Sequence, residues 1–169
     1  MSGRGGVTVD ILVQSPLWER MPAAETTVQR AISAAAGHPS ISQLSTSEGE
    51  VAIVLTDDSA IQALNRDWRG ADKPTNVLSF PAAKTDVAGA PAMLGDIVIA
   101  YETVARESTD EGKDIQHHLA HLAVHGFLHL LGYDHDDDRN ADDMERLESD
   151  ILAGLGIPDP YFARDLDRA

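Results

Sequence analysis

The sequence contains no cysteine among its 169 residues. Disulfide bonds, iron–sulfur clusters and thiolate metal sites are therefore excluded, and a metal site would have to use imidazole and carboxylate ligands. Long apolar runs are also missing. The stretch near the N-terminus is too short for a signal peptide, and no segment approaches the length of a membrane span. We expect a cytoplasmic protein with no membrane partner.

Basic residues are scarce, with 13 lysines and arginines against 28 aspartates and glutamates. A generic nucleic-acid-binding protein usually carries a basic surface, so the net charge of -15 argues against that class. The charges are unevenly distributed, however, because Arg66, Arg69 and Lys73 lie close together while acidic residues crowd the C-terminal third. Net charge governs solubility and steering, and it does not decide what one local groove binds.

The length and the order of apolar patterns favour one α+β domain over residues 1–169. Alternating or β-branched runs predict strands over 7–13, 50–58, 76–81 and 94–101. Helices are expected over 22–36, from an N-cap at Ser59 to Gly70, and over most of the chain after Glu102, with a loop over 82–93. Strands and helices alternate early and helices dominate late, which predicts a small mixed β-sheet packed with helices.

Four of the seven histidines occur in the stretch HLAVHGFLHLLGYDH, from His121 to His135. His125 and His129 are four residues apart in a helical segment, so their rings project from one face about one turn apart. Gly132 is suited to end that helix in a left-handed conformation, and His135 can then return from the following loop. Three imidazoles around zinc leave a fourth position open, as in catalytic sites.

The remaining histidines fit ordinary structural roles better. None of His38, His117 and His118 has a spaced partner beyond its helix, so each is interpreted as a surface or hydrogen-bonded core residue. For His121 two interpretations stay open. Its ring can support a metal ligand without touching the metal, or it can bind the metal itself.

A second segment, LNRDWRGADKPTNVLSFP, runs from Leu64 to Pro81. Its helix, with an apolar stripe ending at Trp68, finishes in a basic residue and a glycine, and a Pro-Thr-Asn turn leads directly into a strand. Each piece also has an ordinary explanation: Arg69 can interact with the helix C-terminus, and Asn76 can fix the turn. Spacing alone does not choose between these roles and a functional one.

Together, IQALNRDWRGADKPTNVLSFP, LGDIVIAYETV and HLAVHGFLHLLGYDH resemble the YbeY family of endoribonucleases that mature ribosomal RNA. The resemblance covers roughly Val51 to Tyr161, including the closing LGIPDPY. The family pattern His-Gly-x-Leu-His-Leu-x-Gly-Tyr-Asp-His is matched at every fixed position from His125 to His135. A match of this length is far more specific than two histidines at helical spacing.

The resemblance implies a single-strand-specific, metal-dependent endoribonuclease acting in ribosomal RNA maturation, including 3′-end processing of 16S rRNA, and in ribosome quality control. It implies an α+β, zincin-like metal-hydrolase fold, with the small ribosomal subunit and assembly GTPases as partners. It also implies zinc, or nickel, on His125, His129 and His135, and a functional arginine at Arg69.

Arginine suits the oxygens of a phosphodiester transition state, because its planar fork donates to them in pairs. We therefore expect Arg69 and the metal ligand His125 to be catalytic, and Arg66, Arg69 and Lys73 to bind substrate.

Two alternatives remain. The histidine spacing is also that of the metzincin zinc peptidases, whose signature is H-E-x-x-H-x-x-G-x-x-H. Those enzymes use the glutamate as general base, and this sequence has Gly126 at that position. The other alternative is a non-catalytic ribosome assembly factor in which a metal only braces the fold, although an open coordination position argues against a purely structural zinc.

Overall fold

The computed structural model describes residues 7–42, 49–82, 93–133 and 138–161. In chain order the elements are β1 (Thr8–Val13), the 3-10 helix η1 (Pro16–Arg20), α1 (Ala24–Gly37), α2 (Pro39–Ser42), β2 (Glu50–Thr56), α3 (Asp58–Arg69), β3 (Val77–Pro81), β4 (Met93–Ala100), α4 (Tyr101–Glu111), α5 (Ile115–Leu130) and α6 (Asp138–Gly154). Most of the predicted loop over 82–93 lies outside the described residues. Within those residues, no helix combines the length and apolar character needed to cross a bilayer.

The four strands form one mixed sheet in the order β1-β2-β4-β3. Strands β1, β2 and β4 run parallel, and β3 pairs antiparallel with β4 at the sheet edge. Pro81 ends β3, which is tolerated because an edge strand has one side without ladder hydrogen bonds. The predicted α+β fold with a small mixed sheet is confirmed.

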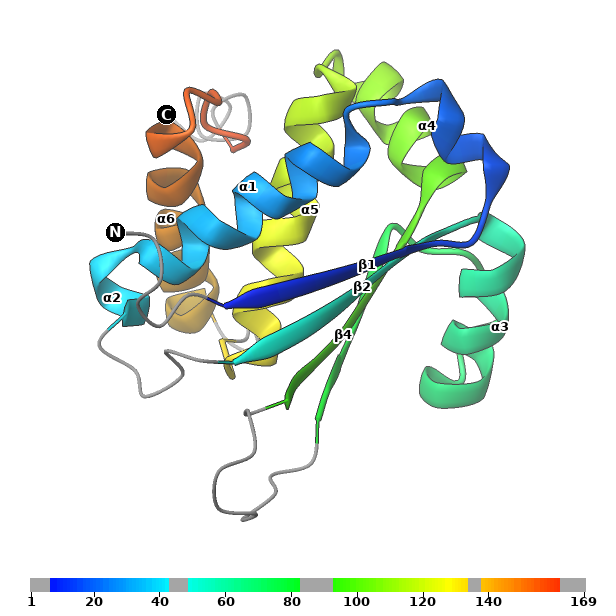
Figure 1. The fold of residues 1–169 in the computed structure, drawn as a ribbon, viewed down its shortest axis with the longest axis horizontal. Helices are drawn as coiled ribbons and strands as arrows, with labels where there is room; N and C mark the ends of the chain where they lie inside the picture. The colour runs from blue at the N-terminus through cyan, green and yellow to red at the C-terminus, as the bar shows by residue number, and fades with distance from the viewer. Residues whose placement is uncertain (1–6, 43–48, 83–92, 134–137, 162–169) are drawn as a thin grey trace.

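The sheet separates two apolar clusters of unequal size. On one face, helices α1, α4, α5 and α6 enclose the main core with residues such as Ile32, Ile97 and Phe127. On the other face, Ile61 of α3 packs against a smaller cluster that contains Leu78 and Val98. Figure 1 shows α1 and α5 together on one side of the strands and α3 on the opposite side. The end of α3 contacts the edge strand β3, because the ring centroid of Trp68 lies 5.9 Å from that of Phe80.

The start of α3 differs from the prediction. Its N-cap is Asp57, whose side chain accepts a hydrogen bond from the Ala60 N–H at 2.9 Å, and not Ser59. Strand β2 ends at Thr56, so the helix begins directly after it and the first available capping side chain is used. The predicted end is confirmed, because Gly70 adopts a left-handed conformation with φ 72°.

Candidate functional site

Helix α5 runs along the sheet and carries the histidine stretch. It begins at the N-cap Asp114, whose carboxylate accepts the N–H groups of Gln116 and His117. It ends as predicted: Gly132 has φ 100° and its N–H donates to the His129 carbonyl at 3.0 Å. The N–H of Tyr133 donates to the Leu128 carbonyl, also at 3.0 Å, which completes a Schellman cap. The helix thus ends at Leu130, and Gly132 belongs to its C-terminal cap.

His125 and His129 point their Nε2 atoms toward one another. The two atoms are 3.1 Å apart, and the ring planes meet at 77°. Two imidazoles that bind one zinc ion tetrahedrally, with Zn–N distances of about 2.0–2.1 Å, hold their nitrogens about 3.3 Å apart. The pair therefore has the separation that a shared metal ion requires. His135, the predicted third ligand, lies outside the described residues, and within those residues no group of three metal-binding side chains occurs.

A buried carboxylate supports this pair from helix α6. Glu148 is fully buried, and its Oε2 lies 2.7 Å from His125 Nδ1. Its Oε1 lies 2.7 Å from His121 Nε2 and accepts a hydrogen bond from the hydroxyl of Tyr161. A carboxylate bound to Nδ1 fixes the proton there, so that Nε2 carries the lone pair that a metal ligand needs.

The protonation state of Glu148 agrees with this role. Burial raises the pKa of its carboxyl, but hydrogen bonds from His121 and His125 outweigh burial and lower the pKa from 4.5 to about 2. The group is therefore an anion at neutral pH. A buried anion strengthens the basicity of the ring that it contacts.

Beside the histidine pair lies a groove of about 700 Å³. Its described lining comes from the end of α3, the turn and strand that follow, and the end of α5: Trp68, Arg69, Thr75, Asn76, Val77, Leu78, Ser79, Phe80, Pro81, His125, His129, Gly132 and Tyr133. The structure thus brings Arg69 into the same groove as the two described histidines, although they are separated by more than fifty residues of chain.

Similar proteins identify the family. The profile of the family described as Endoribonuclease YbeY matches residues 17–156. This chain belongs to the YbeY family. A protein from Bradyrhizobium diazoefficiens named Endoribonuclease YbeY is 55% identical over 92% of this chain and 85% of its own length. A protein of the same name from Rhodopseudomonas palustris is 52% identical, covering 98% of this chain and 87% of that relative.

A solved structure agrees with this assignment. The solution structure of TM1509 from Thermotoga maritima is 26% identical and aligns with a TM-score of 0.50, over 86% of this chain and 87% of that protein. The α+β fold that the resemblance to YbeY proteins predicted is therefore shared with TM1509.

In this YbeY protein the other two predicted substrate-binding residues lie elsewhere. Neither Arg66 nor Lys73 is among the described residues that line the groove. Arg66 forms an exposed ion pair with Asp67 at 3.0 Å. The backbone carbonyl of Lys73 accepts a hydrogen bond from the Asn65 side chain, which fastens the turn to helix α3.

Two residues of the turn and strand have structural roles, and for Asn76 it is the role that spacing alone left open. The Asn76 side chain accepts the N–H of Val77 and donates to Glu107 at 2.9 Å, so it fixes the turn. The Ser79 hydroxyl donates to the Gly126 carbonyl at 2.9 Å and joins strand β3 to helix α5. Both residues also line the groove.

Three of the described histidines outside the pair have side-chain polar contacts. His118 is buried with Nε2 2.8 Å from Glu107, and His38 contacts Asp150 at 2.5 Å. His121 faces Glu148 and Tyr161. His117, which belongs to the same helix, lines a separate depression. His121 and His125 contact the same Glu148 carboxylate, which agrees with an indirect role for His121 in supporting His125.

Glu148 and Tyr161 were not predicted as site residues. A signal for Glu148 exists in the sequence, because helix α6 places Met144, Leu147, Ile151 and Leu152 on its buried face and Glu148 lies within that stripe. An acidic residue on an apolar helix face requires a buried partner. Nothing local identifies that partner as His125, which lies 23 residues earlier.

Proposed function

We propose that this endoribonuclease uses one divalent metal ion to cleave single-stranded RNA during ribosomal RNA maturation, including 3′-end processing of 16S rRNA, and in ribosome quality control. The relatives are named endoribonucleases, and the chain belongs to their family. The observation that carries the proposal is the shared groove, in which Arg69 accompanies the converging Nε2 atoms of His125 and His129.

The metal would be held by His125, His129 and His135. Zinc or nickel suits this set, because both accept neutral imidazole and the sequence has no thiolate to offer. A divalent ion, when bound, supplies a Lewis acid for phosphoryl oxygens and can lower the pKa of coordinated water to about 7. Glu148 acts as a positioning residue, since it holds the His125 ring with Nε2 toward His129.

Arg69 would bind the phosphate that is cleaved. Its guanidinium can donate two parallel hydrogen bonds to phosphoryl oxygens, where negative charge increases as the phosphodiester reacts. Arg66 and Lys73 lie outside the described lining of the groove and would contribute mainly to steering the RNA toward it.

Few phosphate contacts are available to an acidic protein. With a net charge of -15, most of the surface repels RNA, so a rigid duplex should bind poorly and a flexible single strand should enter the groove. Weak binding of isolated RNA favours delivery of the substrate by the small ribosomal subunit or by assembly GTPases in the cytoplasm.

The proposal is tested by metal analysis combined with RNA cleavage. Wild type and the variants His125→Ala, His129→Ala and His135→Ala are purified, their metal content is measured, and each is incubated with single-stranded and duplex RNA. His117→Ala is the control, because His117 lies on the same helix but lines another depression. We expect about one equivalent of metal in wild type and the control, much less in the three variants, and cleavage of single strands only.

Three results would contradict parts of the proposal. Full metal occupancy in all three histidine variants would reject the ligand assignment. Equal cleavage of duplex RNA would reject the strand preference. Proteolysis of casein without any RNA cleavage would favour the peptidase alternative.

A further inference from the structure

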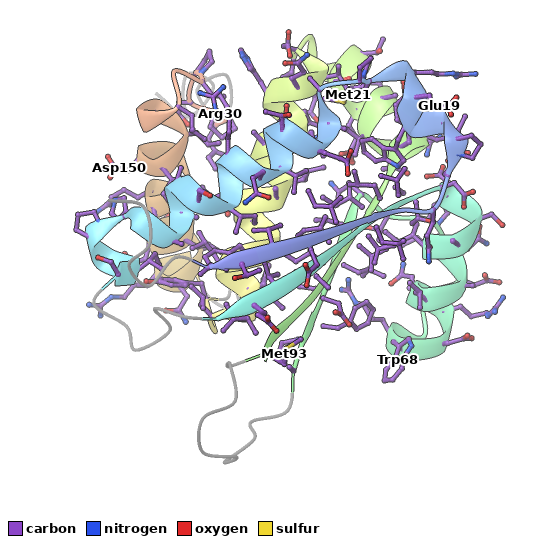
Figure 2. The ribbon with its side chains drawn as sticks, in the orientation of Figure 1. Glu19, Met21, Arg30, Trp68, Met93 and Asp150 are labelled. Carbon is purple, nitrogen blue, oxygen red and sulfur yellow. The ribbon has the colours of Figure 1, made fainter. Side chains whose placement is uncertain are left out.

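Trp68 is unusually exposed for a tryptophan. It has a relative exposure of 71% and lies in the last turn of helix α3, next to Arg69. Figure 2 shows it at the C-terminal end of that helix, at the periphery of the fold. Tryptophan is highly buried on average, so a largely exposed indole is a candidate for contact with a ligand.

The apolar stripe of α3 explains how this exposure arises. Ile61 is fully buried and Leu64 is partly buried against the cluster on that face of the sheet. Trp68 continues the stripe by one turn, beyond the part that the sheet covers. The other tryptophan, Trp18, is 3% exposed and its indole N–H donates to the Thr56 carbonyl at 2.8 Å. One tryptophan therefore serves the core and the other lies at the surface.

Trp68 contacts a second aromatic ring in the groove. The centroid of its ring is 5.9 Å from that of Phe80 in strand β3, with 66° between the planes. Both rings line the groove that also contains Arg69. The described lining has no acidic side chain, although the chain has 28 acidic residues. An aromatic surface beside a cation, with no acidic side chain among its described lining residues, suits a base and its phosphate.

We infer that Trp68 and Phe80 form a stacking site for an unpaired nucleobase of the RNA, adjacent to the phosphate bound by Arg69. The inference rests on the proposed function and adds a physical basis for strand preference. An indole face stacks on any base, because every base has a π-face, but it can do so only when the base is not already stacked in a duplex. The site therefore selects single strands with little regard to sequence.

The test measures binding without catalysis. Metal-free protein is titrated with a short single-stranded oligoribonucleotide, and with the same oligonucleotide carrying one abasic position, while tryptophan fluorescence is recorded. Stacking quenches the fluorescence of Trp68, whereas Trp18 is buried in the core. We expect quenching in wild type and about tenfold weaker binding for Trp68→Ala. Trp68→Phe should keep most of the affinity and lose the quenching.

Leu12→Ala is the matched control, because Leu12 is an exposed apolar side chain in β1, at the opposite edge of the sheet from β3. Its affinity should equal that of wild type. The inference is wrong if Trp68→Ala binds as tightly as the control, if oligonucleotide leaves the fluorescence unchanged, or if an apolar peptide quenches Trp68 and RNA does not.

Cleavage assays separate this inference from the proposed function. If stacking is correct, Trp68→Ala raises KM for single-stranded RNA about tenfold. The preference in affinity for single-stranded over duplex RNA then becomes smaller. If the variant cleaves with the KM of wild type, stacking is wrong while the endoribonuclease assignment stands. If wild type cleaves no RNA, the proposed function fails, and the fluorescence titration still decides whether a base stacks on Trp68.

Discussion

Glu148 Oε2 lies 2.7 Å from His125 Nδ1, which joins helix α6 to the ring that α5 directs into the groove. The same carboxylate contacts His121 and Tyr161, so one buried anion connects α5, α6 and the segment that follows α6. Removing either partner of such a contact leaves a buried polar group without its hydrogen bond. The geometry of the histidine pair therefore depends on a residue that does not reach the metal position itself.

We predict that Glu148→Gln weakens metal binding by about 10- to 100-fold, because the neutral amide no longer supports the basicity and orientation of the His125 ring. Metal affinity is measured by competition with a chromophoric chelator. Asp142→Asn is the control, since Asp142 is an exposed acid on the same helix. Unchanged affinity in Glu148→Gln would mean that the carboxylate only fastens α6 to α5.

A second carboxylate predicts how stability depends on pH. Burial raises the pKa of Glu107, but hydrogen bonds from His118 and Asn76 outweigh burial, and the pKa is lower than its usual 4.5. The folded protein therefore binds this proton less readily than the unfolded chain. The resulting stabilisation is complete above pH 4.5 and decreases as the pH falls below that value.

Urea unfolding of wild type and Glu107→Gln, both metal-free, measures this effect. The excess stability of wild type over the variant should be larger near pH 6 than near pH 3.5. Because other carboxylates titrate in both proteins, only the difference between them is informative. A difference that does not change with pH would show that the interactions of Glu107 are independent of its charge.

Local patterns predicted the parts of the site that lie within one helix or at its ends. The spacing of His125 and His129, the stop at Gly132 and the end of α3 at Gly70 depend on helix geometry and glycine conformation, both of which are local. Glu148 was missed because its role depends on how α6 packs on α5, and a helix pattern specifies a buried face without naming its partner.

Trp68 shows the limit of a correct prediction, because the sequence placed it in an apolar stripe without indicating how exposed it is. The stripe is real, but the sheet ends before it does, and the last ring is exposed. Periodicity shows which face a residue occupies and not how far along the helix that face is covered.

We predict that Arg69→Ala reduces RNA cleavage by about 100-fold or more while metal content and unfolding free energy stay close to those of wild type. The reason is that Arg69 lines the groove, where its loss removes a donor to the reacting phosphate. Arg66→Ala is the matched control: it is the same substitution three residues earlier, at an exposed side chain paired with Asp67.

Cleavage rates and the dependence of binding on salt separate the two arginines. Arg69→Ala should lower the salt slope for a single-stranded oligonucleotide by about 0.7, the value for one phosphate contact. Arg66→Ala should leave cleavage within a few-fold of wild type. Equal losses of cleavage rate in both variants would indicate general steering of RNA by positive charge. Unfolding of Arg69→Ala would indicate a structural role at the helix end.

Gly126 explains why the glutamate of the zinc peptidases has no counterpart here. A Cβ atom at this position would lie 2.9 Å from Ile97 Cγ2 and 3.1 Å from Ser79 Oγ. Ile97 is fully buried, and the Ser79 hydroxyl is hydrogen-bonded to the Gly126 carbonyl, so neither neighbour can easily move. Any side chain at 126 would be forced between α5 and the sheet.

We predict that Gly126→Ala lowers the unfolding free energy, although alanine normally stabilises a helix interior by about 1 kcal/mol relative to glycine. Overpacking a tight core costs about 1–3 kcal/mol, so the clash with Ile97 should exceed the gain in helix propensity. Gly154→Ala is the matched control, because Gly154 also lies in a helix and a Cβ there would meet nothing within 4 Å. Urea unfolding should show a lower unfolding free energy for the first variant and no decrease for the second.

Gly126→Glu, which recreates the peptidase signature, should be less stable still and should not hydrolyse casein, since its carboxylate would have to displace the contact between β3 and α5. A stable Gly126→Glu variant with peptidase activity would show that position 126 has access to the groove and that the packing against Ile97 does not exclude a general base.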